Sequence, residues 1–164
     1  MKVFITGGTG YIGAHLIKEL ISKGHQVHAL VRNIKKATQL PKEGLLLFKG
    51  DLGDSESIKE AMKGCDQVYH MGGDASIWAK DSSRYYTINV DGTRNVLDAA
   101  LELNVKRVVF TSTAGVLGPS HDGVVTEKKF RNIDFFNDYE SSKAMAESLV
   151  KSYVAEQNLD VVIV

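Results

Sequence analysis

The sequence predicts an α/β fold, a doubly wound parallel sheet in a single layered αβα domain of 164 residues. Two observations lead to this prediction. Short apolar segments rich in Val, Ile, Leu and Phe alternate along the chain with longer segments of helical period. The apolar segments are continuous, which is typical of parallel strands covered on both faces, and the intervening segments are long enough for crossover helices.

The candidate strands are, in order, KVFIT (2–6), HQVHALVR (25–32), LLLFKG (45–50), QVYHMG (67–72), RVVFTST (107–113) and DVVIV (160–164). The candidate helices lie between them, at residues 11–23, ended by Gly24, at 54–64, with Asp54 as N-cap, at 84–103 and at 138–157. Two long connections, 73–83 and 114–137, each follow the carboxyl end of a strand. Ligands bind at this edge of open α/β sheets, so we expect the functional site there.

The composition restricts the classes of partner. Twenty basic and twenty acidic side chains balance, so the chain has no overall field to attract nucleic acid or an anionic membrane. Cys65 is the only cysteine, which excludes an intrachain disulfide and a thiolate metal cluster. No apolar run is long enough to span a bilayer, and the N-terminus has too few apolar residues for a signal peptide. We therefore expect a cytoplasmic protein without a metal site.

A glycine-rich turn joins the first candidate strand to the first candidate helix. It reads TGGTGYIG and places Gly7, Gly10 and Gly13 three residues apart. Glycine permits a tight turn and close approach of the backbone to a diphosphate, and the helix N-terminus presents unpaired N–H groups to the anion. A P-loop would need Lys and then Ser or Thr after the last glycine, where this chain has Ala14 and His15. The turn thus predicts a dinucleotide site.

The second candidate strand ends on a basic residue. NAD sites of this kind usually carry an acid there, which accepts hydrogen bonds from the adenosine ribose, but this chain has Arg32. A guanidinium can pair with a 2′-phosphate, whereas an acid would repel it. We therefore expect NADP, with Lys35 and Lys36 as secondary contacts. NAD is the alternative, in which Arg32 is an ordinary exposed side chain.

An ordered set of motifs runs through the whole chain: TGGTGYIG, GDLGD, YHMGG, NVDGTRNVLDAA, VVFTSTAGVLG and YESSK. With these motifs the sequence resembles the extended short-chain dehydrogenase/reductase family, in particular its dihydroflavonol reductase-like and epimerase/dehydratase branches. The resemblance implies a Rossmann fold and an NAD(P)-dependent oxidoreductase or epimerase/dehydratase. It also implies that His70 packs and has no catalytic role.

The resemblance also implies the cofactor contacts. Asp51 and Leu52 should contact the adenine, and Gly72 should pass beside the riboses, where the family usually has a pair of alanines instead of Gly72 and Gly73. The complete set of expected cofactor-binding residues is Gly7, Thr9, Gly10, Tyr11, Ile12, Gly13, Arg32, Asp51, Leu52, Gly72, Tyr139 and Lys143.

Tyr139 and Lys143 are four residues apart on a candidate helix and therefore share a face. Reduction of a carbonyl needs an acid beside the oxygen that gains a proton, and a nearby ammonium lowers the pKa of a phenol toward neutrality. By the resemblance, Tyr139 is the acid/base, Lys143 is that ammonium and also binds the nicotinamide ribose, and Asn89 supports a proton relay. Thr113 binds the substrate oxygen, with Ser112 as the fallback. The alternative is two solvated positions on a helix.

Members of the resembled family continue past the VVIV strand into a C-terminal substrate domain that residues 1–164 do not include. We therefore expect a truncated chain consisting of the NAD(P)-binding domain. Three functions stay open: hydride transfer to or from a carbonyl or alcohol carbon, conversion of a nucleotide-sugar by an epimerase or dehydratase, and NADP(H) binding without turnover. The resemblance also implies a homodimer through helices 84–103 and 138–157.

Overall fold

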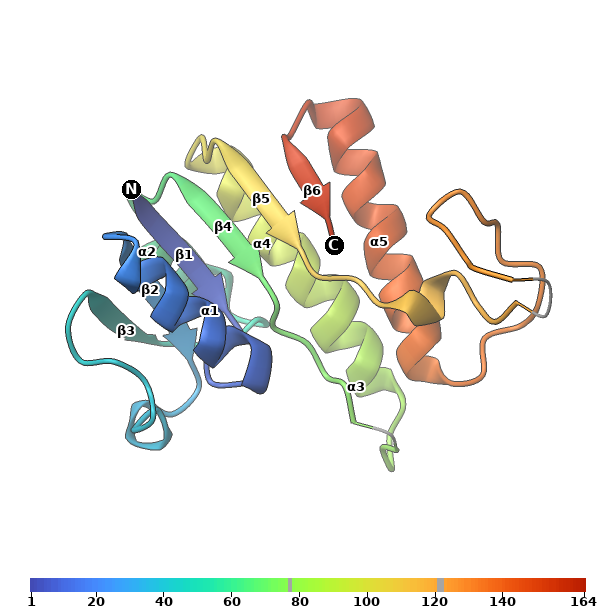
Figure 1. Cartoon of the computed structure of the whole chain (residues 1–164), viewed down its shortest axis with the longest axis horizontal. Coiled ribbons are helices and arrows are strands. Elements are labelled where there is room, and N and C mark those ends of the chain that lie inside the picture. Colours follow the sequence, from blue (N-terminus) through green and yellow to red (C-terminus); the bar gives the residue numbers. More distant parts are fainter. Residues whose placement is uncertain (77, 121–122) are drawn as a thin grey trace.

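The computed structural model describes residues 1–76, 78–120 and 123–164 and places six parallel strands in one sheet (Figure 1). The strands are β1 (Lys2–Thr6), β2 (Gln26–Val31), β3 (Leu45–Lys49), β4 (Gln67–His70), β5 (Arg107–Phe110) and β6 (Val161–Ile163). Their spatial order is β3-β2-β1-β4-β5-β6. The chain therefore winds outward from β1 to β3 and then returns to lie beside β1, which creates a switch point between β1 and β4. The predicted doubly wound α/β fold is confirmed.

The helices follow the predicted segments closely. They are α1 (Tyr11–Ser22), α2 (Ser55–Met62), α3 (Ser83–Tyr86), α4 (Gly92–Glu102) and α5 (Asp138–Gln157), with short 3-10 turns η1 (Ile34–Lys36) and η3 (Ala114–Val116). Asp54 is the N-cap of α2, as expected, because its side chain accepts the Ser57 N–H. Gly24 follows α1 with φ +78°, a conformation that glycine adopts without strain.

The third predicted helix differs from the prediction in one respect. Between α3 and α4 lies a π-helical turn, η2 (Thr87–Asp91), and the backbone stays helical on both sides of it. A periodic apolar pattern does not distinguish a π turn from an α-helix, so the sequence predicted one plain helix over 84–103. The turn contains Asn89.

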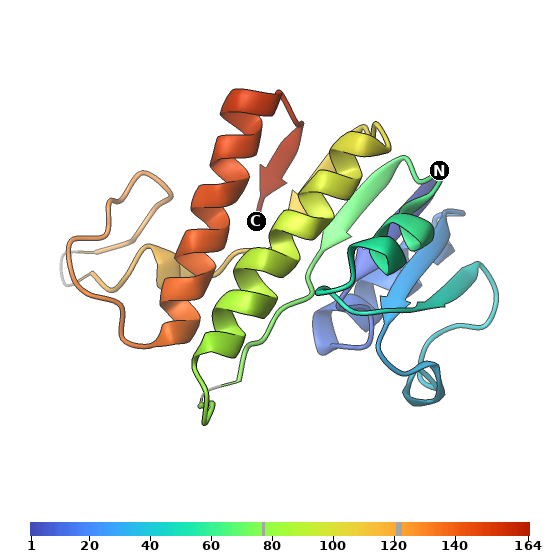
Figure 2. The same ribbon diagram turned by 180° about the vertical axis from the view of Figure 1, so that it is seen from behind.

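Two apolar cores lie on opposite faces of the sheet. Helix α1 packs on one face with the odd-numbered side chains of β1 and β2, among them Val3, Ile5 and Val27. Helices α2, α4 and α5 cover the other face, and Figure 2 shows them in front of the sheet. At β6 the cover is one-sided, because Val161 and Ile163 pack against the core beneath α4 and α5 whereas Val162 is 42% exposed. The expectation that both faces are covered thus fails at this edge strand.

In the described ranges, 1–76, 78–120 and 123–164, no helix has the length and apolar character needed to cross a membrane.

Candidate cofactor and catalytic site

The glycine turn is shaped by close contacts that only glycine permits. A Cβ on Gly13 would lie 2.3 Å from the Gly7 carbonyl oxygen and 2.8 Å from the Gly8 Cα, and Gly7 itself has φ +74°. Gly10 is the N-cap of α1 and donates its N–H to the Gly7 carbonyl at 3.0 Å. No side chain in the described part of the chain caps α1, and its first turn has no acidic residue. The N–H groups at the start of α1 are therefore available to an anion.

A pocket of about 150 Å³ opens beside this turn, at the switch point between β1 and β4. It brings together six of the residues that the sequence predicted for the cofactor: Gly7, Thr9, Arg32, Asp51, Leu52 and Gly72. Gly10, Tyr11, Ile12 and Gly13 belong to the glycine turn and the start of α1, outside the lining of the pocket. Tyr11 and Ile12 are exposed there.

Two of the lining side chains differ in how firmly they are held. Arg32 is exposed at the end of β2 and makes no ion pair within the described ranges. Asp51 accepts the Gly53 N–H at 3.0 Å, so one carboxylate oxygen is used within its own turn. A dinucleotide fits the chemistry of this lining, since it combines unpaired N–H groups, a free guanidinium and a backbone without Cβ atoms at the closest points.

Lys143 is a buried cation on α5. Its Nζ donates to the Thr111 carbonyl at 2.7 Å and lies 4.4 Å from the centre of the Phe110 ring, and the residue is 8% exposed. Burial lowers the pKa of the Lys143 ammonium to about 8, partly opposed by the negative charge of Glu147 one turn further along α5. The ammonium is thus close to its titration range at physiological pH.

Tyr139 lies one turn before Lys143 on the same face of α5 and is half-buried. Its hydroxyl makes no hydrogen bond to another described residue. The phenol therefore keeps its proton for a ligand. Tyr139 and Lys143 line neither the 150 Å³ pocket nor the wider cavity beside β6.

The two hydroxyls considered for the substrate oxygen, Ser112 and Thr113, are engaged differently. Ser112 donates its hydroxyl to Glu147 Oε2 at 2.5 Å, whereas Thr113 Oγ1 accepts the Gly115 N–H at 3.3 Å and keeps its own proton. Both residues line the cavity of about 890 Å³ beside the end of β6. Thr113 is therefore the hydroxyl that is free to donate.

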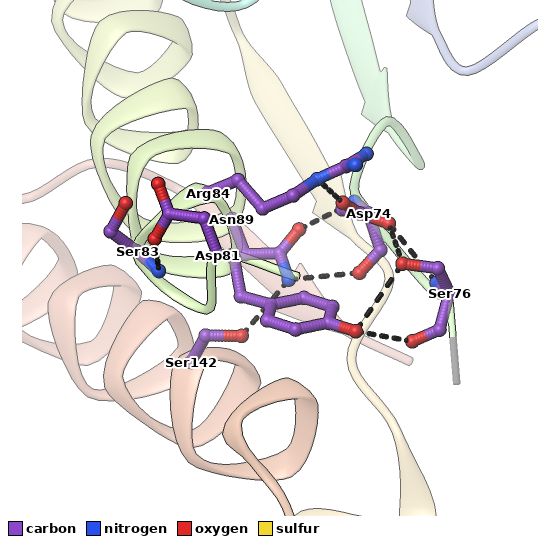
Figure 3. A network of polar contacts seen from close by, with 8 residues as sticks. Asp74, Ser76, Asp81, Ser83, Arg84, Asn89 and Ser142 are labelled. Carbon is purple, nitrogen blue, oxygen red and sulfur yellow. Dashed lines mark hydrogen bonds and ion pairs between the residues drawn. The ribbon is translucent and has the colours of Figure 1, made fainter. Parts of the chain in front are cut away.

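Asn89 is the centre of a buried polar network in the π turn (Figure 3). It is 2% exposed, its Oδ1 accepts the Asp74 N–H at 2.7 Å, and its Nδ2 donates to the Asp74 carbonyl at 3.1 Å and to Ser142 Oγ at 2.9 Å. Ser142 in turn donates to the Tyr139 carbonyl at 2.8 Å. Asn89 thus connects the loop after β4 to the helix that carries Tyr139 and Lys143. π turns occur frequently at functional sites.

His70 is also buried, and both of its ring nitrogens lie within hydrogen-bond distance of a threonine hydroxyl. Its Nδ1 lies 2.7 Å from Thr6 Oγ1 and its Nε2 lies 3.0 Å from Thr93 Oγ1. Thr93 donates its only hydroxyl proton to the Asn89 carbonyl, so Nε2 must be the ring nitrogen that carries hydrogen. Burial, with a smaller contribution from the Lys143 charge, lowers the pKa of His70 to about 3. The ring is neutral and packs, in agreement with the sequence-based expectation.

Asp74 and Arg84 also line the pocket, and no sequence pattern pointed to them. They form an ion pair, with Arg84 Nε 2.6 Å from Asp74 Oδ2. The two residues come from a loop and from α3, ten positions apart, and no spacing rule relates them. Glu147, which holds Ser112, was missed for the same reason, although its place eight residues after Tyr139 puts it on the same helical face.

Comparison with known proteins decides the family. Residues 3–164 match the NAD dependent epimerase/dehydratase family. The chain belongs to that family. This membership confirms the resemblance that the ordered motifs indicated.

The relatives of this member of the epimerase/dehydratase family include reductases. A putative dihydroflavonol 4-reductase from Synechocystis sp. is 35% identical over 163 residues, which cover 98% of this chain and 47% of that protein. Cinnamoyl-CoA reductase 1 from Petunia hybrida is 37% identical over 177 residues, covering 99% of this chain and 52% of that protein. The chain thus spans about half the length of these relatives.

Solved structures of similar fold include epimerases and dehydratases. UDP-glucose 4-epimerase from Thermus thermophilus, in complex with NAD, is 30% identical and superposes with a TM-score of 0.87 over 99% of this chain and 54% of that chain. dTDP-glucose 4,6-dehydratase from Streptomyces venezuelae, with NAD bound, is 26% identical with a TM-score of 0.89, over 99% of this chain and 54% of that chain.

This member of the family has Gly72 and Gly73 in the segment after β4, and its own packing explains both. A Cβ on Gly73 would lie 2.8 Å from Asn89 Oδ1, and one on Gly72 would lie 2.9 Å from Thr6 Oγ1. The Gly72 N–H donates to that same Thr6 hydroxyl at 2.9 Å. The two glycines therefore let the loop lie close to β1 and to the π turn.

Proposed function

We propose that this chain is the cofactor-binding and catalytic domain of an NADP-dependent oxidoreductase that transfers hydride to or from a carbonyl or alcohol carbon. One observation carries the proposal. The pocket beside the glycine turn opens where the strands end, the edge at which this fold binds dinucleotides, and Lys143, one turn after Tyr139 on α5, donates to the Thr111 carbonyl just after β5.

Each catalytic side chain has a role that its surroundings support. The bound nicotinamide dinucleotide would supply the hydride, or accept it in the reverse direction. In reduction, the Tyr139 phenol gives its proton to the substrate oxygen as negative charge develops there, and in oxidation the phenolate takes that proton back. The Lys143 ammonium favours the phenolate, and the Thr113 hydroxyl donates to the same substrate oxygen.

In this proposal Asn89 acts indirectly, through the residues to which it is hydrogen-bonded. Through Ser142 it holds the Tyr139 carbonyl, and through Asp74 it holds the loop beside the pocket. Its contacts support a positioning role for the helix of Tyr139, together with the proton relay that the family resemblance implies.

Arg32 supports NADP as the preferred cofactor, with NAD as the alternative. The guanidinium lines the pocket at the end of β2 without an ion-pair partner in the described ranges, and Lys35 and Lys36 follow in η1. Titration with NADP and with NAD, repeated on Arg32→Ala, tests this preference. We expect NADP to bind more tightly to the parent and the difference to disappear in the variant. Equal affinities in the parent would contradict a 2′-phosphate site.

The reaction is tested by steady oxidation of NADPH with a panel of carbonyl compounds that includes dihydroflavonols and cinnamoyl thioesters. We expect turnover in the parent and its loss in Tyr139→Phe, while cofactor affinity is retained. Tight cofactor binding without turnover in any panel would favour an NADP(H)-binding module instead.

A second candidate is a nucleotide-sugar epimerase or dehydratase acting through transient oxidation. The likeness to the Thermus thermophilus and Streptomyces venezuelae enzymes favours it. Such a reaction consumes no cofactor overall, so conversion of a nucleotide-sugar without net NADPH oxidation would distinguish it from reduction.

The proposed setting is a cytoplasmic homodimer. Helices α4 and α5 lie side by side in both views, with a groove between them lined by Asp98, Leu101, Leu149 and Tyr153, among others (Figures 1 and 2). The pairing would use the outer faces of these two helices, and light scattering tests it.

A further inference from the structure

A second arginine lines the cofactor pocket in addition to Arg32. Arg84, in α3, directs its Nε to Asp74 Oδ2 at 2.6 Å. The Asp74 side chain is 7% exposed, whereas the Arg84 side chain is 52% exposed. The ion pair therefore has its negative end buried in the protein and its positive end at the surface.

The carboxylate that holds Arg84 is itself fixed (Figure 3). Asp74 Oδ1 accepts the Ser76 N–H at 3.0 Å and the Ser76 hydroxyl at 2.6 Å, and Asn89 bonds both backbone groups of Asp74. Burial would raise the pKa of the Asp74 carboxyl, but these hydrogen bonds and the Arg84 charge outweigh it and hold the pKa below its usual value. Asp74 is thus an immobile anion.

The guanidinium has its donors left over. Arg84 Nε lies 2.6 Å from Asp74 Oδ2 in the ion pair, but no side-chain N–H group of Arg84 makes a hydrogen bond to a described residue, and the buried Oδ2 itself has no hydrogen-bond partner among the described residues. The ion pair keeps the guanidinium beside Asp74 at the lining of the pocket, with its N–H donors unused. The planar fork of these donors matches the geometry of phosphate oxygens.

The distribution of charge along the pocket indicates which ligand group the Arg84 guanidinium would bind. The glycine turn offers only N–H dipoles, and the described lining holds two cations, Arg32 and Arg84. Arg32 lies at the end of β2, where a dinucleotide of this fold places its adenosine ribose. Arg84 is therefore the cation that remains for the two charges of the diphosphate.

We propose that Arg84 is a phosphate-binding residue of the cofactor site, held in place by Asp74, and that it contacts the diphosphate while Arg32 contacts the 2′-phosphate. This inference rests on the proposed cofactor site. It divides the binding of NADP between two arginines that can be tested separately.

Two fragments of the cofactor test the contributions of the two arginines to binding separately. ADP-ribose carries the diphosphate without a 2′-phosphate, and 2′-AMP carries a 2′-phosphate without the diphosphate. We expect Arg84→Gln to weaken ADP-ribose binding at least about tenfold, the loss typical of a charge-assisted hydrogen bond, and to leave 2′-AMP within about twofold. Arg32→Gln should show the reverse pattern. Isothermal titration of both fragments against the parent and both variants measures these affinities.

The outcomes separate this inference from the proposed function. A parent that binds neither fragment would contradict the cofactor site itself. A parent that binds both, with ADP-ribose affinity unchanged in Arg84→Gln, would overturn the role of Arg84 alone. Equal losses for both fragments in Arg84→Gln would also overturn it, because they would show a general disturbance of the loop.

A second variant tests whether such a disturbance of the loop explains the result. Asp74→Asn keeps an oxygen for the two Ser76 donors but removes the charge that holds Arg84. We expect it to weaken ADP-ribose less than Arg84→Gln does and to leave 2′-AMP unchanged. A larger loss in Asp74→Asn than in Arg84→Gln would contradict the assignment of Asp74 as the holder and Arg84 as the ligand.

Discussion

Among the described glycines, Gly13 has the closest backbone neighbour. Its missing Cβ would overlap backbone atoms of Gly7 and Gly8, at 2.3 and 2.8 Å, and backbone cannot rotate away as a side chain can. α1 can approach the turn only because this position has no side chain. The motif therefore serves the packing of the helix as well as the binding of an anion.

We expect Gly13→Ala to destabilise the fold by about 2 kcal/mol or more, since overpacking of this kind typically costs 1–3 kcal/mol. Cofactor affinity should fall with it. Thermal unfolding and a dinucleotide titration measure the two effects. Gly53→Ala is the matched control, because its nearest heavy atom would be Asp51 Oδ1 at an ordinary 3.5 Å.

Lys143 carries a cost in stability that depends on pH. Its pKa is about 8 in the folded protein against an ordinary value of 10.5, so the unfolded chain holds the proton more tightly between these two values. The cost is therefore complete below pH 8 and disappears as the pH rises through 10.5. It amounts to about 3 kcal/mol, since one unit of pKa corresponds to about 1.4 kcal/mol.

Lys143→Met removes this cost together with the hydrogen bond to Thr111. The free energy of unfolding of the variant minus that of the parent should consequently be about 3 kcal/mol larger, that is more stabilising, at pH 7 than at pH 11. Urea unfolding at a series of pH values measures the difference. Lys151→Met, at a side chain that is 66% exposed, should show no such trend.

Among the secondary-structure elements, the π turn η2 is stabilised by the side-chain amide of Asn89. Asn89→Ala would leave the Asp74 N–H and carbonyl and the Ser142 hydroxyl short of a buried partner. We expect a loss of about 2–3 kcal/mol in the free energy of unfolding. Denaturant unfolding checks the value, with Asp91→Asn as an exposed control in the same turn. A loss below about 0.5 kcal/mol, as for an ordinary surface substitution, would contradict the role assigned to the network.

The connection between β5 and α5 depends on another single residue. The Arg131 side chain is 8% exposed, donates to the carbonyls of Gly115, Ile133 and Asp134, and pairs with Glu140 at 3.0 Å. Its guanidinium also lies 4.4 Å from the centre of the Phe135 ring. Arg131 thus joins the segment after Thr113 to the first turn of the helix that begins beside Tyr139.

We expect Arg131→Gln to destabilise this connection by about 3 kcal/mol, as when one partner of a buried ion pair is removed. Hydrogen exchange should accelerate in residues 114–120 and 123–137 and remain unchanged in α1 and β1. Lys128→Gln, at an exposed position of the same connection, is the control. Acceleration spread evenly over the whole chain would show that Arg131 has no local role.

For the molecule as a whole, the periodic and repeated features were predictable from the sequence. The order of strands and helices follows from apolar runs, and the bounds of α5 coincide with the predicted 138–157. Gly7 and Thr9 of the glycine turn also line one pocket with Arg32, Asp51 and Gly72, residues that the sequence placed near the ends of neighbouring strands.

The remaining features depend on contacts between distant residues, which no local pattern encodes. The π turn at Asn89 reflects bonds to Asp74 and Ser142, 15 and 53 positions away. The choice between Ser112 and Thr113 depends on Glu147, 35 positions beyond Ser112. Arg84 becomes visible as a pocket residue only when α3 is packed beside the loop after β4.

The proposed homodimer is a prediction at the scale of the assembly. We expect light scattering of the parent to give twice the mass of one chain. The variant Leu149→Glu, in the groove between α4 and α5, should give the mass of one chain. Lys23→Glu, on the far side of the sheet in the turn after α1, should leave the dimer intact. A mass of one chain at every concentration would contradict the pairing.

The parallel direction of the strands has a practical consequence for measuring ligands. Met1 precedes β1 at the amino edge of the sheet, whereas Val164 follows β6 at the carboxyl edge, where its carbonyl accepts the Ser112 N–H at 2.7 Å (Figure 1). A biosensor surface coupled through the first residue would leave the opposite edge open to analyte in flow. A tag or linker fused after the last residue would emerge next to Ser112 and obstruct the measurement.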